Sequence, residues 1–228
     1  MNGITEKLLG IVSDWAGSFN GAFNIRENGQ CAGRQSTAHI KIESKTDVPG
    51  LDIRILPGTK GESVSIPACV THGDVDDLVY NDFFVGEGAD VTIVAGCGVH
   101  ADNEGEAKHN GIHRFFVGKG AKVVYQEKHL GTGAKTAFKR IDPVTDAVLE
   151  DDSYLEMDTV QLGGVDSTLR QTRAKVGNGA KLIVRERIMT DGEEKAETDF
   201  KVEMNGEDSA VDLVSRSVAK GHSCQQFK

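Results

Sequence analysis

The chain has little proline, few aromatic side chains and no closely spaced cysteines. Four of its 228 residues are proline and 6% are aromatic. The cysteines (Cys31, Cys69, Cys97 and Cys224) lie far apart without a CxxC pair, which disfavours a zinc knuckle or a disulfide framework. No apolar run approaches the roughly 18 residues of a membrane-spanning helix. Basic residues are also scarce, 26 against 35 acidic ones for a net charge of −9, so we expect neither nucleic acid nor a membrane as partner.

The N-terminus is predicted to form a short helical segment, residues 1–20. Ile4, Leu8, Ile11 and Trp15 fall at helical spacing, which indicates one amphipathic helix. Acidic side chains interrupt this stretch and no basic leader precedes it, so it does not resemble a secretion signal. We therefore expect a cytoplasmic protein with one further domain, residues 21–228.

Glycine is abundant and marks an internal repeat. The 27 glycines make up about 12% of the chain, against roughly 7% in average proteins. In residues 85–93, 117–125 and 176–184 a glycine turn and a small residue precede an alternating strand. Weaker copies flank these three, and the first strand residues of the five copies are Val64, Val91, Val123, Leu182 and Val211. Their spacing is about 30 residues, except that the interval from Val123 to Leu182 is about twice as long and indicates one degenerate copy in between.

Repeats of this length, built from strands and glycine turns, predict an all-β fold in which stacked copies bury each other's faces. A β-solenoid is favoured over a propeller because the aromatic motif of propeller blades is missing. Repeated hairpins in an ordinary sandwich remain the alternative. Residues 135–152 lose the period and are predicted to leave the solenoid.

The densest group of reactive side chains lies between Cys97 and His113. This short stretch holds one cysteine, three histidines and three carboxylates, namely Cys97, His100, His109, His113, Asp102, Glu104 and Glu106. Thiolate and imidazole donors suit a transition metal or iron. Alternatively, His100 or His109 stabilises a reactive Cys97 thiolate. The remaining interpretation is an exposed acidic loop with a half-buried cysteine. The even spacing of His109 and His113 places them on one face of a strand.

No motif of a known catalytic class is present. GxSxG, HExxH and the phosphate-binding loop are all missing, so we expect no catalytic residues, no enzyme activity and no ATP hydrolysis by the chain itself. One enzymatic alternative is a carbohydrate-active β-helix lyase or hydrolase with Asp74 and Asp76 as its carboxylate pair. The scarcity of aromatics to stack on sugars argues against it.

Four stretches, residues 21–29, 66–74, 96–125 and 215–223, resemble the SufB/SufD scaffold family of the SUF iron-sulfur cluster assembly machinery, and in particular its short SufB-like members. The resemblance implies a right-handed parallel β-helix, in agreement with the repeat. It also implies a scaffold that accepts sulfur and builds a nascent iron-sulfur cluster. A SufD-like structural partner without sulfur chemistry is the alternative within the family.

The resemblance assigns roles to single residues. Cys97 matches the sulfur acceptor, His109 its supporting neighbour, and His113 and His100 further possible ligands. Persulfide transfer needs a thiolate, and we expect a neighbouring imidazole or lysine to lower the pKa of Cys97. The implied partners are a SufC-type ABC ATPase, a SufB- or SufD-like second subunit, and a cysteine desulfurase or sulfur carrier.

The family's cluster ligands are expected beyond the stretch 220–223, close to the last residue, Lys228. We therefore expect this chain to be C-terminally truncated. The resemblance implies a transient iron-sulfur cluster in the full-length protein and none stably bound here.

Overall fold

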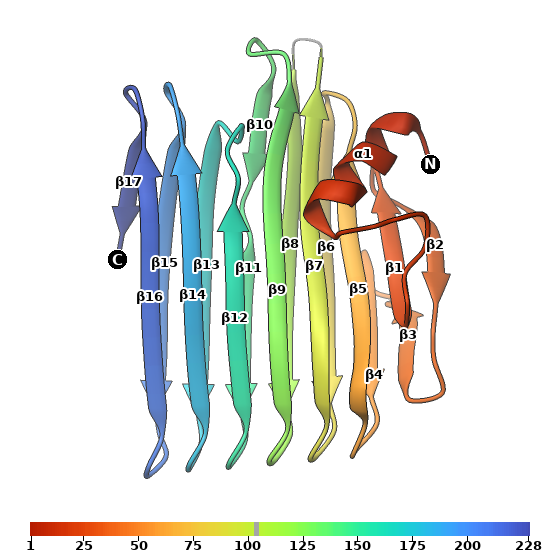
Figure 1. The fold of residues 1–228 in the computed structure, drawn as a ribbon, viewed down its shortest axis with the longest axis vertical. Helices are drawn as coiled ribbons and strands as arrows, with labels where there is room; N and C mark the ends of the chain where they lie inside the picture. The colour runs from red at the N-terminus through yellow and green to blue at the C-terminus, as the bar shows by residue number, and fades with distance from the viewer. Residues whose placement is uncertain (103–104) are drawn as a thin grey trace.

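The computed structural model describes residues 1–102 and 105–228, and they form a β-solenoid of about six turns preceded by one helix (Figure 1). One sheet contains β1 (Ala22–Glu27), β2 (Gln30–Gln35), β5 (Lys60–Val70), β7 (Asp90–Ala101), β9 (Lys122–Gly133), β12 (Tyr154–Gln161), β14 (Lys181–Thr190) and β16 (Ala210–Ala219). The other contains β3 (Ile40–Ser44), β4 (Gly50–Ile55), β6 (Val75–Val85), β8 (Glu106–Val117), β10 (Phe138–Ile141), β11 (Val144–Leu149), β13 (Ser167–Val176), β15 (Lys195–Met204) and β17 (Cys224–Phe227). The chain alternates between the sheets, which confirms the predicted all-β solenoid.

The parallel register explains the repeat. Val91, Val123, Leu155, Leu182 and Val211 pair in one continuous row across the first sheet. Leu155 therefore begins the degenerate copy, and the long interval does hold two coils. The marker predicted for the first copy, Val64, is wrong, because a register shift after Lys60 pairs Glu62 with Val91 instead.

The segment 135–152 stays in the solenoid, contrary to prediction. β10 and β11 both pair with β8, and β11 also pairs with β13 along its whole length. Pro143 lies between the two strands and has no N–H to donate to a ladder. Because the strand is interrupted at Pro143, the repeat of about 30 residues is hard to recognise in the sequence here, although the coil itself is complete.

Helix α1 (Gly3–Val12) covers part of the first sheet and packs on β7, β5 and β9 (Figure 1). Asn2 caps it, since its Oδ1 accepts hydrogen bonds from the backbone N–H groups of Ile4 and Thr5 at 3.0 and 2.8 Å. Leu8 and Val12 are buried beneath it. The helix lies within the predicted segment, and no helix among the described residues combines the length and apolar character needed to cross a membrane.

Two antiparallel hairpins, β1–β2 and β3–β4, close one end of the solenoid. Asn28 and Gly29 form the first turn with φ values of 47° and 80°, as hairpin turns that match the strand twist require. The inward side chains of both sheets form two hydrophobic clusters, and the larger one includes side chains of the hairpins while the smaller one contains Cys97. Phe83 and Phe115 stack within the larger cluster with 4.7 Å between ring centroids.

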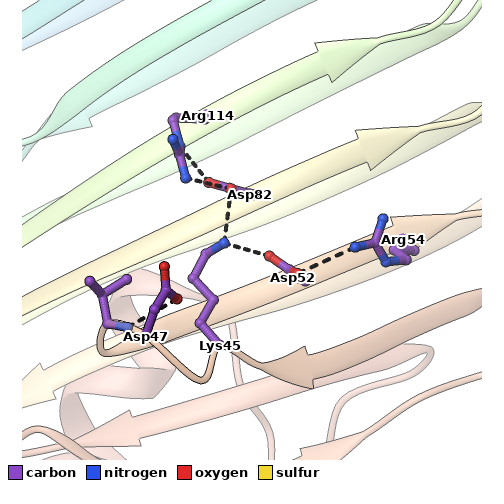
Figure 2. A network of polar contacts seen from close by, with 7 residues as sticks. Lys45, Asp47, Asp52, Arg54, Asp82 and Arg114 are labelled. Atoms are coloured by element: carbon purple, nitrogen blue, oxygen red, sulfur yellow. Dashed lines mark hydrogen bonds and ion pairs between the residues drawn. The ribbon is translucent and has the colours of Figure 1, made fainter.

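A charge network ties residues 45–52 to the outer face of the second sheet (Figure 2). Lys45 contacts Asp52 and lies 2.9 Å from the Oδ2 atom of Asp82. Arg114 donates two hydrogen bonds of 2.6 Å to the same Asp82 carboxylate, and Arg54 pairs with Asp52. None of these groups lines the internal cavity described below, so we assign the network to stability.

Candidate functional site

An internal cavity of about 30 Å³ lies between the two sheets. This is enough for about two water molecules. The described residues that line it are all buried except Arg26. The polar and reactive ones come from both sheets, and they are Asn24, Arg26, Cys97, Glu127 and His129 from the first and Asn81, His109 and His113 from the second.

Cys97 points into this cavity because its two neighbours, Gly96 and Gly98, face α1 on the opposite side of β7. A Cβ atom on Gly96 would lie 2.3 Å from the Val12 carbonyl oxygen, and one on Gly98 would lie 2.9 Å from the Leu8 Cβ. Both glycines therefore allow α1 to lie directly on the strand. Successive side chains of a strand alternate between faces, so Cys97 faces inward, 3% exposed.

The Cys97 thiol is not activated in this structure. Burial raises its pKa well above the ordinary value, and the nearby Cys69, Asp77 and Glu127 add to the increase because each disfavours a thiolate. The prediction that a neighbouring imidazole lowers this pKa is therefore wrong. The physical reason is that burial and the surrounding acidic groups outweigh any imidazole, so Cys97 rests as a protonated thiol.

His109 is hydrogen-bonded to Asp77, which forms an ion pair with Arg26. Its Nδ1 lies 3.0 Å from the Oδ2 atom of Asp77, and Arg26 donates to the same carboxylate from Nε at 2.9 Å and from a terminal nitrogen at 2.7 Å. Burial alone would raise the pKa of Asp77, but the hydrogen bonds from His109 and Arg26 hold it well below the usual range. Because Nδ1 donates to a carboxylate, Nε2 carries the free lone pair of the neutral form of the ring.

His113 reaches the same space from two residues beyond Gly111. Its Nδ1 lies 2.8 Å from the Tyr125 hydroxyl, which donates to the Oε1 atom of Glu127 at 2.8 Å. Burial lowers the pKa of His113 to about 4, so the ring is neutral, and its Nδ1 donates to the hydroxyl while Nε2 is unprotonated. A Cβ atom on Gly111 would lie 2.9 Å from His113 Nε2 and 3.6 Å from His109 Nε2. The predicted shared face of the two histidines is confirmed.

His100 lies on the other face of β7 from Cys97. Its Nδ1 is 2.9 Å from the Thr132 hydroxyl and its Nε2 is 2.9 Å from the Asp102 Oδ2. The structure thus separates His100 from the cavity, Glu106 is exposed, and Glu104 lies outside the described residues. Within residues 1–102 and 105–228, no three His, Cys, Asp or Glu side chains converge as a ready metal site.

Sequence reasoning missed the buried charges beside Cys97. His129 pairs with Cys97 in register on the neighbouring strand. Arg170 lies 2.7 Å from a Glu127 oxygen, 3.2 Å from a Glu186 oxygen and 3.2 Å from the Nδ1 atom of His129. One signal could have found them: Tyr125, Glu127 and His129 alternate along a strand of the repeat, so their polar groups must point inward.

Asp74 and Asp76, the carboxylate pair expected for a carbohydrate-active enzyme, lie outside the internal cavity. Asp74 is exposed in a turn with φ of 62°, and Asp76 is exposed and lies 3.4 Å from the Lys108 ammonium. Neither of them lines the internal cavity. Their placement gives this alternative no support.

Comparison with known proteins gives consistent matches. Residues 80–228 match the family described as "SUF system FeS cluster assembly, SufBD core domain". An iron-sulfur cluster assembly SufBD family protein of Archaeoglobus fulgidus is 28% identical over 182 residues, which is 79% of this chain and 47% of that protein. A SufBD family protein of Methanothermobacter thermautotrophicus is 25% identical over 184 residues, 79% of this chain and 43% of that protein. The chain thus spans less than half the length of these relatives.

Proposed function

Because the chain belongs to the SufBD core-domain family of the SUF system for iron-sulfur cluster assembly, we propose that it is a non-catalytic scaffold component that accepts sulfur at Cys97. The accepted sulfur joins iron in a nascent cluster, which is built together with a SufC-type ABC ATPase. The observation that carries this proposal is the place of Cys97, whose side chain faces an enclosed cavity shared with His109 and His113.

The cavity suits a persulfide in two respects. It has room beyond the Cys97 sulfur for a second sulfur atom. Its wall also offers the Nε2 atoms of His109 and His113, which accept a hydrogen bond from an S–H group when the rings are neutral. His109 and His113 therefore act as supporting residues in this proposal. His100 does not, because it faces away.

The proposed partners follow from the family. A SufC-type ATPase supplies the nucleotide chemistry for which the chain has no motif, and a SufB- or SufD-like subunit forms the second half of the assembly. A cysteine desulfurase or a sulfur carrier supplies the sulfur. Each partner belongs to the whole assembly, of which this chain is one part.

Mass spectrometry tests the role of Cys97. The chain is incubated with a cysteine desulfurase and cysteine, alkylated and digested, and persulfide is mapped on each cysteine. We expect persulfide on the Cys97 peptide, and its loss in Cys97→Ser with no change at the exposed Cys31. Total persulfide that is equal in the wild type and in Cys97→Ser would contradict the assignment.

We further propose that this chain alone holds no stable cluster. Cys97, His109 and His113 share a cavity, yet among the described residues they do not form a converged set of ligands. After anaerobic reconstitution with iron, sulfide and thiol, we expect no persistent brown chromophore on the desalted protein. A strong chromophore with stoichiometric iron and sulfide would overturn this proposal.

A SufD-like structural role is the second candidate, and the raised pKa of the buried Cys97 thiol favours it. In this role the solenoid pairs with a sulfur-accepting subunit and performs no sulfur chemistry. The two roles differ in a reconstituted assembly system. Cluster formation that is unchanged by Cys97→Ser supports the structural role, and its loss supports sulfur acceptance.

A further inference from the structure

We propose that the chain forms a symmetric dimer through the outer face of its second sheet, so that the partner of this face is a second copy of the chain. The contact centres on the outward side chains of β8 and β11. This face lies on the outside of the solenoid, so the inference does not depend on the role of Cys97 in the internal cavity. Helix α1 packs on the first sheet, on the other side of the molecule, and stays uncovered (Figure 1).

Three rows of outward side chains cross the same six strands of this sheet, β4, β6, β8, β11, β13 and β15. Paired residues of a parallel sheet lie side by side on one face, so the register defines each row. In strand order the aromatic row contains Arg54, Phe84, Phe116, Val148, Lys175 and Glu203. The charged row contains Asp52, Asp82, Arg114, Asp146, Arg173 and Lys201. The third row contains Gly50, Tyr80, Ile112, Val144, Gln171 and Asp199.

The charged row is complementary to itself in reverse order. From β4 to β15 its signs are negative, negative, positive, negative, positive and positive, and from the other end each sign becomes its opposite. A two-fold axis parallel to the strands, between β8 and β11, places each row of one copy against the same row of the other in reverse order. Every position of the charged row then faces an opposite charge. A second copy of the chain therefore fits this face electrostatically.

The centre of the contact is a reciprocal ion pair. Arg114 faces the partner's Asp146, and by symmetry Asp146 faces the partner's Arg114. Two hydrogen bonds of 2.6 Å to Asp82 hold the Arg114 guanidinium in place, and they leave its Nη1 free among the described residues (Figure 2). Asp146 lies beside Arg114 and forms no hydrogen bond within the described part of the chain. A side chain that is already ordered loses little entropy on binding, which favours this pair.

The outer charges contribute less. Lys45 already lies between Asp52 and Asp82, so these two carboxylates add little across the interface. At the ends of the aromatic row, Arg54 and Glu203 are both exposed and face each other across the axis. Exposed pairs of this kind add little affinity, but they determine the register in which the two copies meet.

Apolar side chains flank the central ion pairs on both sides. Phe116, 39% exposed, faces the partner's Val148, 42% exposed, and in the third row Ile112 faces the partner's Val144. Phe116 also stacks on Phe84 with 5.1 Å between ring centroids.

The two halves of the face also differ in shape. The two stacked rings stand on β6 and β8, whereas a groove of about 290 Å³ lies between the aromatic and charged rows from β8 to β15. The reversed order places the rings of one copy opposite this groove of the other. The shape of the face is therefore complementary to itself as well.

The face is nearly neutral although the whole chain carries a net charge of −9. Its acidic side chains, five in all, almost balance its basic ones, which are Lys45, Arg54, Arg114, Arg173, Lys175 and Lys201. Two acidic chains repel each other least where such a face meets its copy. Six strands about 4.8 Å apart and three rows give roughly 600 Å² on each copy, which is near the lower limit of specific interfaces. We therefore expect a weak dimer with a micromolar dissociation constant.

Sedimentation velocity tests the dimer on the full chain, from low micromolar to several hundred micromolar concentration. We expect a concentration-dependent dimer, weakened at least about tenfold by Val148→Lys, which buries an ammonium beside the partner's Arg114. Val218→Lys is the matched control, because it makes the same change at an exposed position on the first sheet and should leave the dimer intact. Circular dichroism establishes that both variants are folded. A monomer at every concentration, or a dimer that Val148→Lys leaves unchanged, overturns the inference.

A charge exchange tests the symmetry. Glu203→Arg brings two cations together at each end of the aromatic row, and Arg54→Glu brings two acids together there. We expect each single variant to weaken the dimer several-fold and the double variant, which restores opposite charges, to recover the strength of the wild type. A double variant that is no stronger than the single ones contradicts the two-fold arrangement.

Crosslinking with a short bismaleimide locates the axis, in a background with the exposed Cys31 and Cys224 replaced by Ser. From the spacings of strands and packed sheets, the two Cα atoms at position 148 should lie about 11 Å apart and those at position 203 about 26 Å apart. Val148→Cys should therefore give a crosslinked dimer, whereas Glu203→Cys should not. A dimer that is crosslinked by Glu203→Cys and not by Val148→Cys would place the contact at the last coil and refute the proposal.

Discussion

The Nδ1 atom of His109 lies 3.0 Å from the Asp77 carboxylate, and this contact fixes which nitrogen of the ring faces the cavity. Asp77 also neutralises Arg26, so one carboxylate orders two groups of the site. We predict that Asp77→Asn lowers the free energy of unfolding by about 3 kcal/mol, because it breaks a buried ion pair. Urea denaturation measures the change.

Asp76→Asn is the control for this variant. Asp76 is the adjacent residue, but it lies on the exposed face of the strand, and its pair with Lys108 spans 3.4 Å. Removing an exposed pair of this kind should cost less than about 1 kcal/mol. Equal effects of the two substitutions would show that burial adds nothing to the Asp77 contacts.

Arg170 is a buried cation between two carboxylates, Glu127 and Glu186. Arg170→Met leaves both buried acids without this cation, so we predict a loss of about 3–5 kcal/mol in the free energy of unfolding. Replacing all three residues with apolar ones of similar volume should restore much of that loss, since it removes the buried charges together. Arg187→Met, which breaks an exposed pair with Asp158, is the control. A triple variant less stable than Arg170→Met would refute this account.

His113 should make stability depend on pH between about 4 and 6.5. Its pKa is about 4 in the folded chain, because burial disfavours the charged ring, against about 6.5 when unfolded. In this range the unfolded chain binds more protons, so the free energy of unfolding falls as the pH falls. The contribution of His113 is complete above a pH of about 6.5 and amounts to about 3 kcal/mol.

The check for His113 is urea denaturation across this pH range in the wild type and in His113→Gln. The variant should show a shallower dependence on pH, although it is less stable at neutral pH. His222→Gln changes an exposed ring and should keep the wild-type slope. Identical slopes in the wild type and in His113→Gln would contradict the prediction.

Gly96→Ala should lift α1 from the sheet. The new methyl group would lie 2.3 Å from the Val12 carbonyl oxygen, a contact that requires the helix to move. We predict a loss of about 1–3 kcal/mol in the free energy of unfolding, as overpacking usually costs. Cys69, whose pKa burial raises to about 12, should then react faster with an aromatic disulfide reagent. The measurement uses a background with Cys31 and Cys224 replaced by Ser. Gly33→Ala is the control and should leave the rate unchanged, because a Cβ at Gly33 would make an ordinary contact 3.5 Å from Phe23.

Much of this fold could be predicted from the sequence because its repeat depends on glycine corners, which local conformation requires. The shared face of His109 and His113 was equally accessible, because strand alternation alone determines it. The orientation of His100 followed from the same alternation once Cys97 was placed inward. The state of the Cys97 thiol was not predictable, because Asp77 and Glu127 reach it from other strands. Arg170 stands far from Cys97 along the chain, and only the stacking of coils brings it to Glu127.

The uneven coils of the solenoid show where its length is free to vary. The coil from Val123 to Leu155 is longer than the next one, from Leu155 to Leu182. His129 pairs with Gln161, and Val144 pairs with Gln171, so these two pairs bound the same part of both coils. The stretch from His129 to Val144 is longer than the stretch from Gln161 to Gln171 by the full difference in length between the two coils. Insertions at this corner leave every row in register. One residue inserted within a strand would instead move every following side chain of that strand to the opposite face. Insertions are therefore tolerated at the corners of the solenoid and not within its strands.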